Sequence, residues 1–209
     1  MLEAAYGRRA FAFQTLNFRK GTQQEIHTDV VHFHSVPERF MCGVWIALED
    51  ISADAGPLAY YLGSHKLPIM TMRRAGVNHS PPRVEDYQSR YVPALRVQLR
   101  DANLPASTAI LKKGQALVWA ANLAHGGAPI IDPASSRRSL VVHFYFHGCA
   151  YYTPMVSVEE SGGYAMRLPT NVRTGFVEWP RLKGRPAKVH PKFLLEAAWK
   201  VLFRQMHTQ

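Results

Sequence analysis

The chain has 209 residues, and this length predicts one globular domain with a core large enough to fold without disulfides. Hydrophobic residues make up 47% of the chain and charged residues 19%, which excludes a disordered chain and a coiled coil. The formal net charge of +10 favours an anionic substrate or partner. Residues 181–209 hold seven Lys and Arg against one Glu, so most of the excess belongs to a basic tail, and nucleic-acid binding is disfavoured.

The N-terminal segment and the two cysteines indicate where the protein acts. Residues 1–13 contain Glu3 and have no apolar run followed by a cleavage site, so we expect no secretory signal. No apolar stretch approaches the roughly 18 residues of a membrane-spanning helix. Cys42 and Cys149 are too few for a disulfide framework. The sequence therefore predicts a cytoplasmic protein with two reduced thiols and no membrane span.

Short runs rich in β-branched and aromatic residues, separated by Gly, Pro and Asn, predict a mainly β fold. Several short strands at this spacing favour a barrel or a sandwich. The Lys-Lys-Gly-Gln stretch at residues 112–115 predicts a hairpin turn between two of the strands. The expected strands cover residues 11–18, 40–48, 58–62, 109–111, 115–120 and 139–146.

Residues 73–106 interrupt this pattern and predict an inserted loop. The segment contains four prolines and has room for a short helix around residues 84–91. A long insertion in a β domain is often a lid or a binding loop. Its basic residues favour an anionic or phosphorylated substrate. They are Arg73, Arg74, Arg83, Arg90, Arg96 and Arg100.

The C-terminal segment predicts an amphipathic helix over residues 191–206. Apolar residues recur there with the helical period of about 3.6, after Pro191 in the first turn. We expect this helix to pack on the sheet or on a second subunit, which would make the protein a homo-oligomer. The expected domains are residues 1–180, a β domain with its insertion, and residues 181–209, a basic tail and helix that pack on it.

Ten histidines raise the question of which of them are metal ligands. His27 and Asp29 are two positions apart, and on a strand their side chains would point to the same face. His125 follows the strand expected at 115–120 and is the best candidate for a third ligand from another strand. Two His and one carboxylate on one face leave three positions of an octahedral ion open, as in non-haem Fe(II) oxygenases.

Arg137 and Ser139 open the last predicted strand and are expected to share one of its faces. A guanidinium offers a forked hydrogen-bond donor to a carboxylate, and a hydroxyl adds one more hydrogen bond. Such a pair suits the far carboxylate of 2-oxoglutarate. Taken alone, Arg137 would instead be read as a surface residue at the start of an edge strand.

These residues belong to an ordered series of motifs. Gln24 precedes the His27-x-Asp29 pair, and the runs CGVWIALED (42–50) and AGPLAYYLGSHKLP (55–68) follow. Later come KKGQ (112–115), NLAHGG (122–127) and SRRSL (136–140). The series resembles the phytanoyl-CoA dioxygenase family over about residues 14–154. Its order and spacing make the resemblance specific.

The resemblance implies a double-stranded β-helix, a jelly-roll or cupin-like barrel with a few helices, that uses Fe(II), 2-oxoglutarate and O2. It implies that His27, Asp29 and His125 are the catalytic metal ligands and that Arg137 binds 2-oxoglutarate. Ser139 would assist, and Trp45 would lie near the cosubstrate.

The expected activity is hydroxylation of a small or carrier-linked, anionic metabolite, with release of succinate and CO2. Related halogenases replace the metal-binding carboxylate with a small residue, so Asp29 excludes halogenation. Only 26 residues precede His27, fewer than is usual in the family. This predicts either a fragment or a chain that lacks part of the outer sheet and of the substrate pocket.

Two other functions stay open. His32, His34 and Glu38 imitate the first motif of cupins, and with a later His they would hold Mn, Ni or Zn for a non-oxygenase activity. The glycines that normally flank that motif are absent, so we expect His32 and His34 near the rim of the site instead. A catalytically inactive binding relative is the second alternative.

Two further side chains have simpler expected roles. His143, on the strand that begins near Arg137, is expected to line the pocket rather than to bind metal. Cys149 is expected to be a buried thiol, because no third group is present that would orient a Cys–His pair for nucleophilic catalysis.

Overall fold

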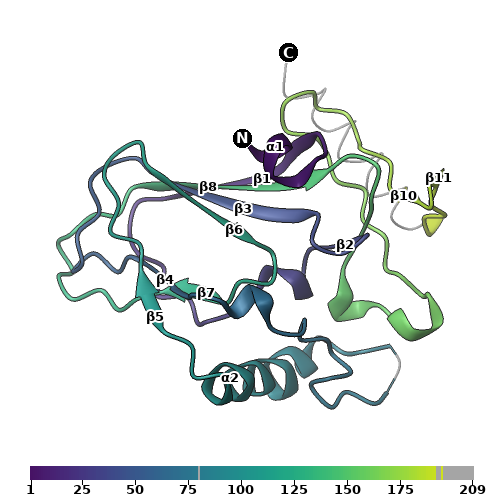
Figure 1. The fold of residues 1–209 in the computed structure, drawn as a ribbon, viewed down its shortest axis with the longest axis horizontal. Coiled ribbons are helices and arrows are strands. Elements are labelled where there is room, and N and C mark those ends of the chain that lie inside the picture. Colours follow the sequence, from purple (N-terminus) through teal and green to yellow (C-terminus); the bar gives the residue numbers. More distant parts are fainter. Residues whose placement is uncertain (80, 192–193, 195–209) are drawn as a thin grey trace.

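The computed structural model describes residues 1–79, 81–191 and 194 and has a mainly β fold (Figure 1). Its larger sheet is antiparallel and has the strand order β1-β8-β3-β6. These strands are β1 (Ala10–Phe18), β8 (Ser139–Phe146), β3 (Met41–Ala47) and β6 (Ala116–Ala120). A smaller sheet has the order β5-β4-β7, formed by β5 (Ala106–Thr108), β4 (Leu58–Tyr61) and β7 (His125–Gly127).

The remaining elements surround these two sheets. β2 (His34–Val36) pairs with β9 (Ala150–Tyr152), and β10 (Arg181–Leu182) pairs with β11 (Arg185–Pro186). The α-helices are α1 (Leu2–Tyr6) and α2 (Val92–Asp101), and a π-helical turn (Tyr87–Tyr91) leads into α2. Short 3-10 turns cover Asp29–Val31, Ser64–Lys66, Pro154–Val156 and Glu159–Ser161.

The larger, four-stranded sheet and the smaller, three-stranded sheet face each other across a shared core, and the smaller sheet lies below the larger one in Figure 1. Trp45, Trp119 and Val141 of the larger sheet pack in one buried cluster with Leu58 of the smaller sheet. Side chains that alternate along β8 point inward, as the burial of Ser139 and the other odd-numbered residues shows. This is the jelly-roll arrangement that the sequence predicts. None of the helices in the described part of the chain is long and apolar enough to cross a membrane.

The strand expected at residues 109–111 is wrong. The strand β5 lies three residues earlier, at residues 106–108, and the apolar side chain of Ala109 packs in the core between the sheets. Residues 112–115 do form a turn, in which the Gln115 N–H donates to the Lys112 carbonyl at 2.9 Å and Gly114 has a φ of 84°. This turn is not a hairpin, because β5 and β6 belong to different sheets.

The insertion is more helical than its prolines suggest. A helix does form where the sequence predicts a short one, around residues 84–91, but it is longer: residues 85–86 are helical, and the π-helical turn and α2 continue the helix to residue 101. Pro93 lies in the first turn of α2, directly after the π-helical turn. The buried face of α2 packs against Val77 of the insertion and Met72 just before it. The expected helix at 191–206 falls almost entirely outside the described residues, and the division at residue 180 stays a prediction.

Candidate functional site

His27 and His125 are brought together by an antiparallel bridge between two segments. The backbone N–H of each residue donates to the carbonyl of the other at 2.9 Å, and the ring centroids lie 4.5 Å apart. Gly126 permits this close approach, since a Cβ there would lie 2.6 Å from the Gln24 carbonyl oxygen. The glycine after His125 therefore has a steric role in the site.

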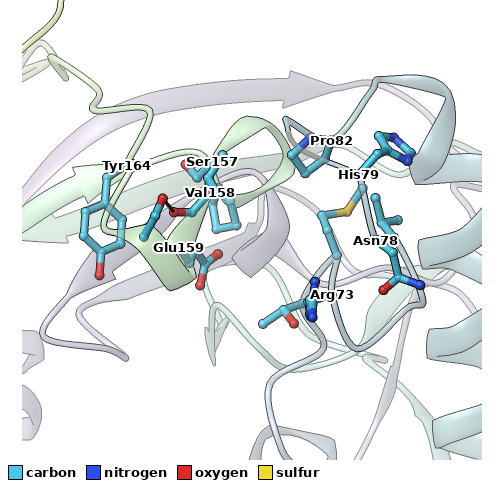
Figure 2. Close-up of a pocket in the computed structure, with 13 residues that line it drawn as sticks. Arg73, Asn78, His79, Pro82, Ser157, Val158, Glu159 and Tyr164 are labelled. Atoms are coloured by element: carbon cyan, nitrogen blue, oxygen red, sulfur yellow. Dashed lines mark hydrogen bonds between the residues drawn. The ribbon is translucent and has the colours of Figure 1, made fainter.

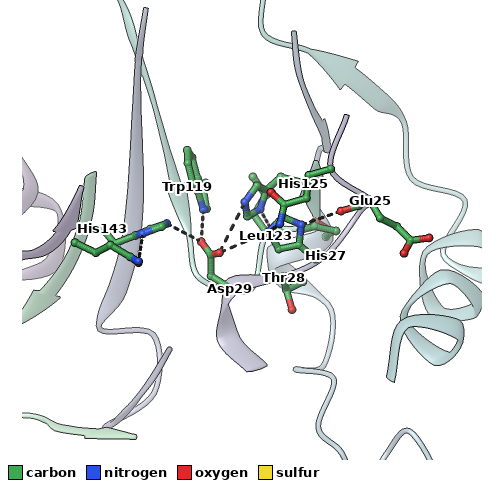
Figure 3. A network of polar contacts seen from close by, with 12 residues as sticks. Glu25, His27, Thr28, Asp29, Trp119, Leu123, His125 and His143 are labelled. Carbon is green, nitrogen blue, oxygen red and sulfur yellow. Dashed lines mark hydrogen bonds and ion pairs between the residues drawn. The ribbon is translucent and has the colours of Figure 1, made fainter. Parts of the chain in front are cut away.

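The spacing of His27 and Asp29 predicts that both lie on a strand. Asp29 instead begins a 3-10 turn directly after the bridge. The turn still directs its carboxylate toward both imidazoles. Asp29 Oδ1 lies 3.8 Å from His27 Nε2 and 3.9 Å from His125 Nε2 (Figure 3). Among the described residues, these three form the group whose ligand atoms all lie close enough to hold a metal ion, within 4.8 Å of one another.

Hydrogen bonds orient both imidazoles for this purpose. His27 Nδ1 donates to the Glu25 carbonyl at 2.9 Å, and His125 Nδ1 donates to the Leu123 carbonyl at 3.0 Å. Each Nε2 then carries a lone pair and faces Asp29, which is the tautomer that a metal ligand requires. Burial, together with the charge of His125, lowers the pKa of His27 to about 4, so His27 is neutral at physiological pH.

The second carboxylate oxygen of Asp29 is held from the other side. Trp119 Nε1 donates to Asp29 Oδ2 at 2.8 Å, and His143 Nε2 lies 3.7 Å from the same oxygen. Burial raises the pKa of Asp29, but the charges of His125, His143 and His27 and the Trp119 hydrogen bond outweigh it, so the pKa is lowered. The carboxylate is therefore ionised, with Oδ1 turned to the imidazoles and Oδ2 turned to the indole.

Trp119 fits beside Asp29 because Gly43 stands opposite it in the sheet. The two residues are register partners on β3 and β6, and a Cβ on Gly43 would lie 2.3 Å from the indole ring. Sequence reasoning missed this partner of Asp29. The only signal is a glycine within an apolar strand, and its partner lies 76 positions away in the sequence.

A second polar group lies at another part of the same core. Arg137 is buried, donates from Nη1 to the Gly56 carbonyl at 3.0 Å, and has its guanidinium 5.7 Å from the Trp45 ring. The reading of Arg137 as a surface residue is therefore wrong. Arg137 Nε, Ser139 Oγ and Trp45 Nε1 are three of the five buried side-chain polar atoms that lack a hydrogen-bond partner in the described part of the chain.

One cavity of about 190 Å³ joins the two groups. His27, Asp29 and His125 line it, as do Arg137 and Trp45. The other walls are mostly apolar or aromatic side chains with a few polar ones. They comprise Gln14, Leu16, Phe18, Thr22, Gln24, His32, Phe33, Leu58, Trp119, Gly126, Val141 and His143.

The cupin-like residues do not assemble a second ligand set within the described residues. His32 lines the cavity, whereas His34 is buried on β2 beside Tyr152, and Glu38 is exposed. His143 lines the cavity, and its Nδ1 donates to Gln14 Oε1 at 3.0 Å.

Both cysteines are free and buried, as expected. Burial raises the pKa of the Cys149 thiol, although Arg8 Nη1 lies 3.3 Å from its sulfur. A raised pKa disfavours the thiolate that nucleophilic catalysis needs.

A larger and more open pocket of about 540 Å³ lies elsewhere (Figure 2). Arg73, Asn78 and His79 of the insertion form one wall, and residues 157–164, after β9, form the other. None of the residues of the His–Asp–His group or of the Arg137 group lines this pocket.

Comparison with known proteins agrees with this geometry. The family described as phytanoyl-CoA dioxygenase (PhyH) matches residues 3–139, which include the whole of the His27–Asp29 and His125 region. No curated protein matches the chain in sequence.

Solved structures with the same fold include two enzymes of nogalamycin biosynthesis. The non-heme alpha ketoglutarate dependent epimerase SnoN is 18% identical, with a TM-score of 0.54 over 89% of this chain and 64% of its own. The carbocyclase SnoK is 15% identical, with a TM-score of 0.55 over 74% of this chain and 58% of its own. The chain thus spans about three fifths of the length of these enzymes, and at such identities the likeness concerns the fold.

Proposed function

Because this chain belongs to the phytanoyl-CoA dioxygenase family, we propose that it is an Fe(II)- and 2-oxoglutarate-dependent oxygenase. The observation that carries the proposal is one cavity with two distinct polar groups. A His–Asp–His set suited to iron lies in it together with an unpaired, buried guanidinium suited to a carboxylate. SnoN, which shares the fold, has been solved with Fe3+ and alpha ketoglutarate, and this supports both ligands here.

In this proposal His27, Asp29 and His125 hold the iron. Two neutral imidazoles and one ionised carboxylate are the donor set of non-haem Fe(II) enzymes, and they leave three positions for other ligands. When bound, the iron and 2-oxoglutarate supply the oxidation chemistry, in which O2 is consumed, succinate and CO2 are released and a substrate C–H bond is oxidised. The protein supplies ligation, orientation and a shielded cavity.

Arg137 would bind the far carboxylate of 2-oxoglutarate. Its Nη1 is occupied by Gly56, but its Nε is buried and has no partner. The Ser139 hydroxyl and the Trp45 indole N–H lack partners too, and both can donate to an oxygen. A dicarboxylate would satisfy donors that are otherwise costly to bury.

Hydroxylation of a small or carrier-linked metabolite is the reaction that we favour. The carboxylate of Asp29 occupies the position that a halogenase leaves to chloride, which disfavours halogenation. SnoN and SnoK are an epimerase and a carbocyclase, so the outcome after C–H oxidation depends on the substrate. A catalytically inactive binding relative would keep the fold but would not need the donor set to be complete.

The test is an anaerobic titration with Fe(II) followed by 2-oxoglutarate. Chelation of the metal by the keto acid gives a visible charge-transfer band, which we expect in the wild type and expect to be lost or weakened in Asp29→Ala. Arg137→Ala should need a much higher 2-oxoglutarate concentration. Arg138→Ala is the matched control, because its side chain is 62% exposed. No band in folded wild-type protein with excess iron would refute the proposal.

A further inference from the structure

The arginines of the insertion do not supply positive charge to the cavity. Arg96 forms an ion pair with Glu25, Arg100 pairs with Asp101, and Arg74 donates to the Ile69 carbonyl. None of the six arginines of residues 73–106 lines the cavity that contains the His–Asp–His group. Any charge that selects an anionic substrate must therefore come from another segment.

Arg167 is such a charge, and it lies behind the rim of the cavity. It follows β9, and its backbone N–H donates to the Tyr151 carbonyl at 2.7 Å. Its guanidinium carbon lies 4.8 Å from the ring centroid of Phe33, a residue of the cavity wall. Burial is the main cause that lowers the pKa of His32, the neighbouring wall residue, and the positive charge of Arg167 makes a smaller contribution in the same direction. Stacking on Phe33 fixes the plane of the guanidinium.

The guanidinium of Arg167 is incompletely paired. Nη1 donates to Thr153 Oγ1 at 3.1 Å, whereas Nε is buried without a partner. No described carboxylate lies within ion-pairing distance of Arg167. Because a buried N–H normally has a hydrogen-bond partner, this arrangement suits an anion that the described residues do not provide.

Tyr145 lies in the core near Arg167. Its hydroxyl is buried and also lacks a partner, and the charge of Arg167 acts on it. The ring of Tyr145 stacks on Phe13 at 4.1 Å, and Phe13 packs edge-on against Phe33. Two unsatisfied donors, a guanidinium N–H and a phenol O–H, thus meet near one aromatic cluster.

β8 relates this region to the rest of the site. Its inward residues run in the order Ser139, Val141, His143 and Tyr145. Ser139 belongs to the group around Arg137, His143 contacts Asp29, and Tyr145 lies near Arg167. A strand rises about 3.3 Å per residue, so His143 lies about 13 Å from Ser139 and about 7 Å from Tyr145 along β8. His143 therefore lies between the unsatisfied donors near Arg137 and those near Arg167.

We propose that Arg167 binds an anionic group of the substrate, a carboxylate or a phosphate monoester, at the end of the cavity opposite to Arg137. This inference rests on the proposed function, since it assigns Arg137 to the cosubstrate. Nε and the second terminal nitrogen of Arg167 form one edge of the guanidinium, and such an edge matches two oxygens of a carboxylate or phosphate. An anchor there holds the substrate on the far side of the metal ligands from 2-oxoglutarate. Arg167 is thus a residue that determines substrate class.

The test compares matched anions and neutral amides on the anaerobic protein with Fe(II) and saturating 2-oxoglutarate, so that the Arg137 group is occupied. The probes are hexanoate, octanoate and hexyl phosphate, with hexanamide and octanamide as uncharged partners. Binding is followed by the shift of the charge-transfer band and by equilibrium dialysis. We expect the anions to bind at least about tenfold more tightly than the amides.

This preference should fall to near one in Arg167→Gln and take an intermediate value in Arg167→Lys, which keeps the charge but loses the fork. The band formed with iron and 2-oxoglutarate should be unchanged in both variants, which reports that they are folded. A preference that survives in either variant at the wild-type value overturns the inference. So does a wild type that binds anions no better than amides, or binds none of the probes at about 10 mM. If the band itself fails in the wild type, the proposed function fails first, so the two failures are distinguishable.

Discussion

The hydrogen bond between Trp119 and Asp29 gives the sharpest prediction for a single change. Trp119→Phe removes the N–H that holds Asp29 Oδ2 at 2.8 Å and leaves an aromatic ring of smaller size in place. A hydrogen bond to a buried carboxylate contributes roughly 1.5–3 kcal/mol. Without it, Asp29 can turn away from His27 and His125. We therefore expect the affinity for Fe(II) or Co(II) to fall by roughly 10- to 100-fold.

The assay is competition of the metal-free protein with a chelator of known affinity, under anaerobic conditions for Fe(II). Trp179→Phe is the matched control, because that indole is 44% exposed and donates to a backbone carbonyl away from the cavity. Replacement of Trp119 by benzothienylalanine, in which sulfur takes the place of the N–H, separates the hydrogen bond from packing. An affinity that stays at the wild-type value in both Trp119 variants would refute the idea that Trp119 orients Asp29.

Three further predictions concern the surroundings of the site. Gly43→Ala should lower the free energy of unfolding, measured by urea denaturation, by about 1–3 kcal/mol and should also weaken metal binding, because the new methyl overlaps the Trp119 ring. Unchanged stability would contradict the close approach of Gly43 to Trp119. Arg137→Lys should raise the KM for 2-oxoglutarate by about tenfold with a smaller effect on kcat, since Lys has no fork; an unchanged KM would place the cosubstrate elsewhere. Burial, with a contribution from Arg39, lowers the pKa of His34 to about 4 from the ordinary 6.5, so its neutral form contributes stability that is complete above about pH 6.5 and is lost as the pH falls toward 4. About 2 kcal/mol of this loss should be visible when urea denaturation of the metal-free protein is compared at pH 7.5 and pH 5, and the difference should be smaller in His34→Gln. The same pH dependence in that variant would contradict the prediction.

The sequence predicts the strands best where side chains alternate between two environments. The strand expected at residues 139–146 is β8 residue for residue, because from residue 139 to residue 145 buried positions alternate with partly buried ones. Residues 109–111 look like a strand for a different reason, since Ala109 and Leu111 pack in the core and Ile110 is exposed, although the segment lies just beyond β5. Local patterns do not distinguish burial in a sheet from burial beside one.

The sequence predicts that His27, Asp29 and His125 come together, but it does not predict how the fold achieves this. His27 and Asp29 do face one centre, but a bridge followed by a 3-10 turn achieves this, rather than a strand. The pairing of Trp119 with Asp29 depends on the register of β3 against β6, and no local pattern encodes that register. Arg167 stands outside the motifs, and only the folded chain places it behind Phe33.

The most direct measurement is a crystal structure of the protein with Mn(II) and an unreactive 2-oxoglutarate analogue, recorded with anomalous scattering from the metal. We expect one metal peak at about 2.0–2.3 Å from His27 Nε2, Asp29 Oδ1 and His125 Nε2. The far carboxylate of the analogue should lie on Arg137 and Ser139. A peak at His32 or His34, or a metal held without Asp29, would contradict the central claim.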